Sequence, residues 1–175
     1  MEGEFPVDEE DGSEGYNEDG WEIVRRDLDM EIRDKYMKGF YERLFGDQLS
    51  EVRNGLMIDN IGFQPPEKWL TLPDMGYLIV NRYNVILVHL GNLCLTLFPM
   101  TTPHSSTASI YYIRLVNNDR WIQVNMKDGL PLPRVTIDWK MFHSQVSTSW
   151  MLGFAGRLQY WIHLSPMIPS YVSLE

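Results

Sequence analysis

Two apolar runs meet at a short polar turn near the middle of the chain. They cover residues 85–90 and 93–98, and Gly91-Asn92 lies between them. A two-residue turn that begins with Gly suits the type II′ geometry of a β-hairpin. The pattern therefore predicts a hairpin in which Leu90 lies opposite Leu93.

In that register, successive side chains point to opposite faces of the sheet. The first face is wholly aliphatic and comprises Ile86, Val88, Leu90, Leu93, Leu95 and Leu97. The second face is mostly apolar with a few polar groups and comprises Val85, Leu87, His89, Cys94, Thr96 and Phe98. Because neither face is predominantly polar, we expect the sheet to be covered on both sides.

Two further strand candidates follow a loop rich in Ser and Thr. They cover 110–116 and 120–126, and Asn117-Asn118-Asp119 supplies turn residues between them. The pattern thus predicts four antiparallel strands, over 85–90, 93–98, 110–116 and 120–126.

Helical periods precede and follow these strands. Apolar residues recur every three or four positions over 21–44, which predicts one long amphipathic helix. Asn17 or Asp19 is placed to cap its start, and Gly46 to end it. Shorter helices are predicted over 48–57, 73–82 and 158–164, the second with Pro73 in its first turn.

The aromatic residues of the C-terminal third follow no regular period, so no element is assigned to them. They are Trp139, Phe142, Trp150 and Phe154. Taken together, the elements predict an α+β fold, with helices packed around a small, mainly antiparallel sheet.

Composition predicts one soluble, intracellular domain, in the cytoplasm or nucleus. The chain has 175 residues, of which 44% are hydrophobic, enough to bury the core of one compact domain. Its single Cys excludes an internal disulfide framework. No early apolar run resembles a signal peptide, and no run reaches the ~18 residues of a membrane-spanning helix.

The acidic balance of the chain comes from its beginning. Residues 1–20 hold nine of the 24 acidic residues and no Lys or Arg, so the remainder is formally neutral. We interpret this head as solvated, and an acidic segment that docks on a basic partner is the alternative. No basic cluster supports binding to nucleic acid.

The best candidate for catalytic chemistry is a histidine beside the cysteine. In the predicted register, His89 and Cys94 are direct cross-strand neighbours, and such a pair can form a reactive thiolate. Reactive thiols usually lie in electropositive clefts, whereas Cys94 has aliphatic neighbours in the middle of a predicted sheet. We therefore favour a packed, inert thiol.

The other titratable residues show no site-like spacing. His104, His143 and His163 are widely separated, so no metal site is predicted. Asp27 and Glu31 share a helix face, where acidic pairs are usually solvated. The sequence thus predicts no cofactor.

A series of segments, in order, resembles the ovarian-tumour-type (OTU) cysteine proteases, in particular the deubiquitinase-like domains of plant and fungal mobile elements. The likeness covers about residues 16–163. The segments are Tyr-Asn-Glu-Asp-Gly-Trp (16–21), Val-Arg-Arg-Asp-Leu (24–28), Pro-Glu-Lys-Trp-Leu (66–70), Leu-Pro-Asp-Met-Gly-Tyr (72–77), Arg-Tyr-Asn-Val-Ile-Leu-Val (82–88), Leu-Phe-Pro (97–99), Val-Asn-Asn (116–118), Gln-Val (123–124) and Pro-Leu-Pro (131–133).

The chain differs from the family at the positions of the catalytic nucleophile and the general base. The family's nucleophile is in an Asp-Gly-x-Cys segment, whose usual spacing leads to Phe5, and no Cys precedes Cys94. The family's general base is a His that opens the last strand, where this chain has Arg120. An Arg cannot accept a proton near neutral pH. The resemblance therefore implies an OTU-like domain, truncated at its N-terminus, with no catalytic residues.

The resemblance also implies a division of the chain and a partner. It gives an acidic head over 1–16, an OTU-like domain over 17–165 and a tail over 166–175. Ubiquitin or a ubiquitinated protein is the implied partner. Three alternatives stay open: an interaction module with an acidic docking head, an active hydrolase that uses Cys94 with His89, and a mobile-element remnant without selected function.

Overall fold

The computed structural model describes residues 20–57, 65–117 and 120–164. The predicted caps Asn17 and Asp19, the acidic head and the C-terminal tail lie outside these ranges. The described elements are α1 (Gly20–Arg33), α2 (Lys38–Phe45), the 3-10 helix η1 (Gly46–Gln48), α3 (Leu49–Leu56), η2 (Pro66–Lys68), α4 (Asp74–Tyr83), β1 (Ile86–His89), β2 (Leu95–Leu97), β3 (Ile110–Val116), β4 (Arg120–Gln123), α5 (Ile137–Phe142), η3 (Gln145–Ser147), α6 (Thr148–Gly153) and α7 (Ala155–Leu164).

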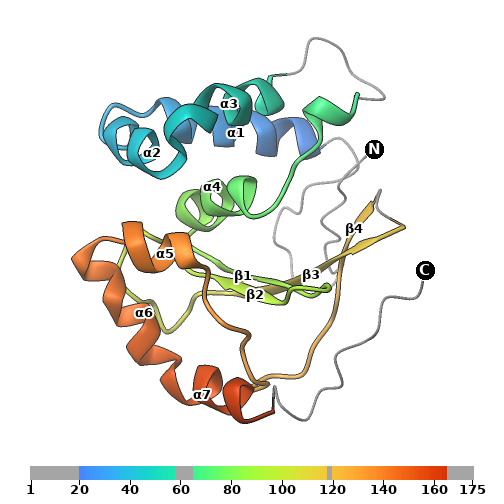
Figure 1. Ribbon diagram of the computed structural model, residues 1–175, viewed down its shortest axis with the longest axis vertical. Coiled ribbons are helices and arrows are strands. Elements are labelled where there is room, and N and C mark those ends of the chain that lie inside the picture. Colours follow the sequence, from blue (N-terminus) through green and yellow to red (C-terminus); the bar gives the residue numbers. More distant parts are fainter. Residues whose placement is uncertain (1–19, 58–64, 118–119, 165–175) are drawn as a thin grey trace.

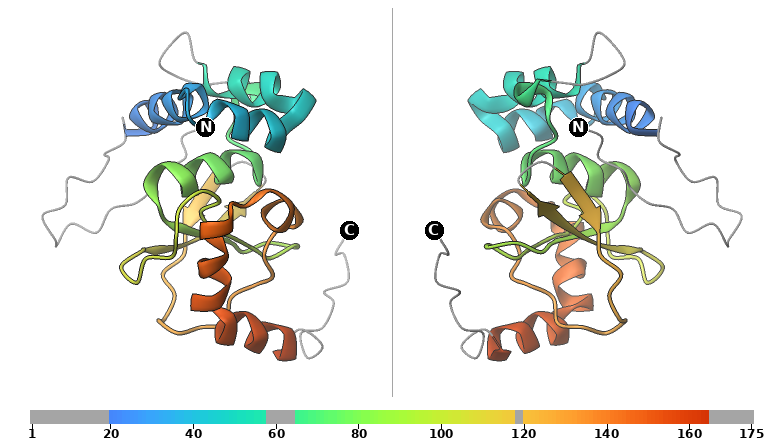
Figure 2. Two further views of the ribbon diagram at one scale, coloured as in Figure 1. Left: turned by 90° about the vertical axis from the view of Figure 1, so that its left-hand side faces the viewer. Right: turned by 90° about the vertical axis from the view of Figure 1, so that its right-hand side faces the viewer.

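The fold is α+β, with helices on both faces of a small mixed sheet, as Figures 1 and 2 show. α4 packs on one face, with α1, α2 and α3 beyond it. α6 and α7 lie on the other side. Ile86, Leu87 and Val88 are all fully buried, although successive side chains of a strand point in opposite directions. This confirms that the sheet is covered on both sides at β1.

The prediction of four antiparallel strands is wrong at one pairing. The strand order is β2-β1-β3-β4, and β1 pairs with β3 in parallel, whereas the other two pairings are antiparallel. The outer edge of β2 is occupied, because Thr96 forms a bridge with Val135 and its N–H bonds to Arg134. β3 therefore lies on the other side of β1, next to a strand that runs in its own direction.

The hairpin register differs from the predicted one by one residue. His89 lies opposite Leu95, and Leu87 opposite Leu97. The connection is wider than two residues, because the N–H of Leu90 bonds to Ile113 and thus continues the pairing with β3. A slip of one residue changes the cross-strand partner of every side chain, so the predicted division of the hairpin into two faces is wrong.

The long helix predicted over 21–44 is two helices, α1 and α2. The side chain of Asp34 accepts hydrogen bonds from the N–H groups of Tyr36 (2.7 Å) and Met37 (3.3 Å). Such local bonds compete with the helical ladder, which explains the break. Gly46 ends α2 with a positive φ of 51°, as predicted.

The shorter helices predicted from the sequence are confirmed as α3, α4 and the C-terminal part of α7. Two helices were missed, namely α5 and α6. Each has six residues and supplies one deeply buried aromatic side chain, Trp139 and Trp150 respectively. Both rings pack on Phe98. Six residues are too few for a period to emerge, so tertiary packing decides these two elements.

Candidate functional site at the junction of α1, η2 and β4

A buried arginine joins α1 to η2. The Arg25 guanidinium donates to the carbonyl of Gly55 and, at 2.6 Å, to the carbonyl of Lys68. The residue is only 5% exposed, and burial lowers the pKa of its side chain. Its guanidinium carbon also lies 5.5 Å from the centre of the Trp21 ring. These contacts satisfy one buried and one part-buried carbonyl and hold η2 against α1.

Lys68 completes the end of α3. Its Nζ donates to the Asn54 carbonyl at 2.7 Å and to Asn54 Oδ1 at 2.8 Å. The last carbonyls of a helix have no partner within the helix, and cationic side chains satisfy them well. Arg25 and Lys68 together therefore cap α3 and fix the segment that follows η2.

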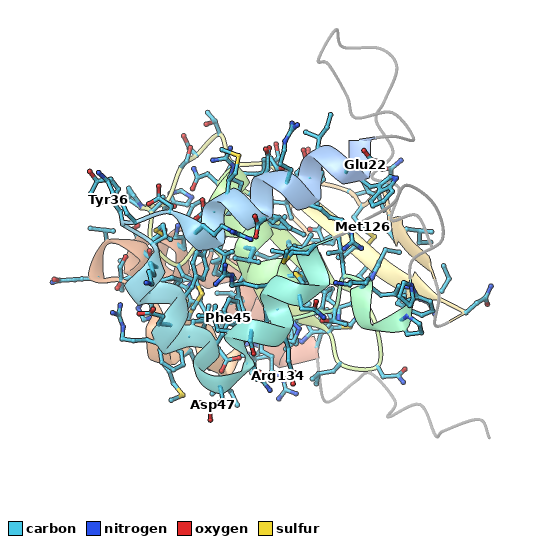
Figure 3. All side chains as sticks on the ribbon, turned by 90° about the horizontal axis from the view of Figure 1, so that it is seen from above. Glu22, Tyr36, Phe45, Asp47, Met126 and Arg134 are labelled. Carbon is cyan, nitrogen blue, oxygen red and sulfur yellow. The ribbon has the colours of Figure 1, made fainter. Side chains whose placement is uncertain are left out.

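Trp121 of β4 holds the same segment from the other side. Its indole N–H donates to the Leu70 carbonyl at 3.2 Å. The His89 ring meets the Trp121 ring edge to face, with centroids 5.4 Å apart. Figure 3 shows Glu22 of α1 and Met126, which follows β4, on the same side of the molecule. The junction thus combines the start of α1, η2 and the edge of the sheet.

His89 is a half-buried imidazole at the end of β1. Burial lowers its pKa, and a hydrogen bond with the Leu93 backbone partly offsets this effect. The turn lies directly against the ring, because a Cβ on Gly91 would come within 2.9 Å of Nε2. The imidazole is therefore neutral near neutral pH and is enclosed by the turn.

The predicted pairing of His89 with Cys94 is wrong. His89 lies opposite Leu95, so Cys94 precedes β2 and belongs to the turn instead of the middle of the sheet. Its Sγ is 3.3 Å from the Gly91 carbonyl, to which the thiol donates. The partner of the Cys94 thiol is therefore a backbone carbonyl of the turn.

The other three histidines lie apart in the C-terminal region. The His104 ring packs edge-on against Trp150, and the His143 ring stacks on Trp139. His163 Nδ1 contacts the Gln159 carbonyl at 2.8 Å. Among the residues that the structure describes, no three His, Cys, Asp or Glu side chains come together as ligands for a metal ion.

Asp27 and Glu31 are not the solvated pair that the sequence predicted. Asp27 Oδ2 accepts a hydrogen bond from the Tyr83 hydroxyl at 3.2 Å. Glu31 Oε1 accepts one from the Tyr41 hydroxyl at 3.0 Å. Both carboxylates thus face neighbouring helices. Asn81, which donates to the Tyr41 hydroxyl, is the one amide in an apolar stretch of α4. That pattern could have indicated a buried polar network at this position.

Arg120 opens β4 opposite Val116, at the start of the last strand as predicted. Comparisons with protein-family models, with curated proteins and with solved structures found no match. Within the described ranges, every helix is too short or too polar to span a lipid bilayer.

Proposed function

We propose that this chain is an OTU-like domain that binds ubiquitin or a ubiquitinated protein without cleaving it. The position of Trp121 carries the proposal. Its side chain bonds to Leu70, the last residue of the segment 66–70, and packs on His89, which directly follows the segment 82–88. Segments that are far apart in the chain are expected to lie together in this way if their ordered resemblance to OTU proteases reflects a common fold.

The absence of cleavage follows from the chemistry of Arg120 and Cys94. A thiol hydrolase needs a base that takes the proton of its nucleophile, and a guanidinium cannot take it. Cys94, the single cysteine of the chain, lies in the turn before β2, where its thiol donates a hydrogen bond to the Gly91 carbonyl. Cysteine peptidases lose most of their activity when one member of the catalytic set is absent.

The surface proposed for binding comprises four residues, which we call the His89–Trp121 patch. The Leu93 backbone bonds to His89, the His89 ring packs on Trp121, and Leu115 is the partner of Trp121 in the β3–β4 ladder. Leu93 is 50% exposed and Leu115 is 36% exposed. Neighbouring exposed apolar side chains with a central Trp are typical of protein interfaces.

The test is a titration of isotopically labelled ubiquitin with the full chain, followed by NMR. We expect shifts of surface resonances, and we expect Leu115→Glu and Leu93→Glu each to weaken binding by about tenfold or more. Leu152→Glu is the matched control, because Leu152 is 76% exposed on α6. Incubation with ubiquitin chains should release no monoubiquitin.

Three results would contradict the proposal. Unchanged spectra at about 1 mM of the chain would exclude ubiquitin as the partner. Equal weakening by Leu152→Glu would show that the patch is not the binding surface. Cleavage of ubiquitin chains that disappears in Cys94→Ala would establish an active thiol hydrolase instead.

A further inference from the structure

A hydroxyl and an imidazole lie in contact between α5 and α6, in a region that the proposed function does not use. His143 Nε2 is 3.3 Å from Thr148 Oγ1. The other ring nitrogen, Nδ1, is 2.7 Å from the carbonyl oxygen of Trp139. His143 is half-buried, whereas Thr148 is exposed.

These two contacts determine which atoms carry the protons. A carbonyl oxygen can only accept, so His143 Nδ1 carries the hydrogen and donates it to Trp139. A neutral imidazole protonated at Nδ1 has its lone pair at Nε2. In this neutral form of the ring, the Thr148 hydroxyl donates to Nε2, and its oxygen keeps its lone pairs for solvent or for a substrate.

The orientation of the imidazole is supported by the core. The His143 ring stacks on the Trp139 ring, with centroids 4.1 Å apart and an angle of 7° between the planes. Trp139 is 2% exposed, and its indole N–H donates to the Pro99 carbonyl at 3.1 Å. The base is therefore held by a buried residue, as an activated nucleophile requires.

The neighbouring hydroxyl groups have other partners. Ser147 Oγ donates to the Thr102 carbonyl at 3.0 Å, and Ser144 Oγ contacts Ser147 Oγ at 2.9 Å. Ser149 Oγ donates to the Val146 carbonyl at 2.7 Å. Among these hydroxyls, Thr148 is the one that contacts an imidazole.

We propose that Thr148 is an acyl-transfer site, with His143 as its general base and an activated acyl ester as its substrate class. Thr148 Oγ1 attacks the ester carbonyl carbon, and Nε2 takes the hydroxyl proton as the new C–O bond forms. The bond to the leaving group then breaks, and the proton passes from Nε2 to the departing oxygen. The products are Thr148 ester and the free alcohol or phenol.

The test treats the full chain with p-nitrophenyl acetate and locates the acetyl group by mass spectrometry of the peptides. We expect Thr148 to acquire it first, with a matching release of p-nitrophenol. His143→Gln should slow acetylation of Thr148 by about 100-fold, the usual scale of a general base. Thr148→Ser should keep the reaction, and Thr148→Val should abolish it.

Thr107→Val is the matched control, because the exposed Thr107 hydroxyl contacts Ser105 and no imidazole. It should change neither the site nor the rate of acetylation. Thermal unfolding of each variant separates loss of reactivity from loss of the fold. Acetylation of Thr148 no faster than that of Thr107, or unchanged in a folded His143→Gln variant, would overturn the proposal.

Discussion

At the scale of single residues, a chain of hydrogen bonds with determined directions joins the helices to the end of β2. The N–H of Met100 donates to Asn81 Oδ1 at 2.7 Å, and Asn81 Nδ2 donates to the Tyr41 hydroxyl at 3.1 Å. Because the Tyr41 oxygen accepts from Asn81, the Tyr41 hydroxyl donates its own hydrogen bond to Glu31 Oε1. Burial raises the pKa of Tyr41, so its hydroxyl remains a donor.

The ionised side chain of Glu31 lowers the free energy of unfolding at neutral pH. Burial, reinforced by Asp34, raises the pKa of Glu31, whereas the bond from Tyr41 and the charge of Arg82 lower it. The ionised form is thus less favourable in the folded state than in the unfolded state. This penalty is absent below the unfolded-state pKa and full above the folded-state pKa, so it grows as pH rises between the two.

Glu31→Gln should therefore stabilise the protein at pH 7 by up to about 1 kcal/mol, because Gln removes the charge and keeps an acceptor for Tyr41. The gain should disappear near pH 4, where a normal carboxyl takes up its proton. Urea unfolding at the two pH values measures both effects. Tyr41→Phe is the control and should destabilise by about 1–3 kcal/mol, since it leaves Asn81 without its acceptor. A destabilised Glu31→Gln variant would contradict this account.

At the scale of elements, α4 approaches the sheet closely at one glycine. A Cβ at Gly76 would lie 2.7 Å from Leu97 Cδ2 and 2.8 Å from Leu72 Cδ2. Leu97 is fully buried in β2, so it has little room to move. The packing distance between α4 and the sheet therefore depends on the absence of a side chain at this position.

Gly76→Ala should destabilise the protein by about 1–3 kcal/mol through overpacking. Gly39→Ala in α2 is the matched control, because the nearest atom to its added Cβ is 3.9 Å away at the end of Arg43. That control should stabilise by up to about 1 kcal/mol, as Ala favours a helix more than Gly does. Urea unfolding of both variants gives the comparison. Equal effects of the two substitutions would show that α4 does not pack as described.

At the scale of the whole molecule, one arginine connects the C-terminal helix to the sheet. Arg157 Nε donates to the Leu130 carbonyl at 2.6 Å, and Nη2 lies 2.9 Å from the Tyr112 hydroxyl. Its guanidinium also packs near Phe154. α7 itself has a single buried side chain, Leu158, so these contacts contribute much of what holds it in place.

Arg157→Lys should release α7 without unfolding the rest, because an ammonium cannot reproduce the planar fork of a guanidinium. Amide exchange measured by mass spectrometry should accelerate over 155–164 by about tenfold or more and stay unchanged in α4. Arg33→Lys is the control, since Arg33 forms an exposed ion pair with Asp29. Equal acceleration in α4 and α7 would mean global destabilisation instead.

The sequence predicted the local elements better than the candidate site. The helices α3 and α4 and the strand β3 follow from apolar periods and turn residues, which are local properties of the chain. The pairing of His89 with Cys94 was wrong because it depended on a register that Leu90 decides by bonding to Ile113. Trp121 was the centre of the junction, and its bond to Leu70 joins residues 51 positions apart, so no local pattern could reveal it.

The sequence alone determined the α+β class, because the period of its apolar positions selects helix or strand at each segment. It also determined that the central strand β1 would be buried on both of its faces. Tertiary structure alone decided the parallel pairing of β1 with β3, the hairpin register, and the partners of Arg25, Glu31 and Trp121. The physical reason is that these features depend on hydrogen bonds and close packing between distant segments, which compete only once the chain is compact.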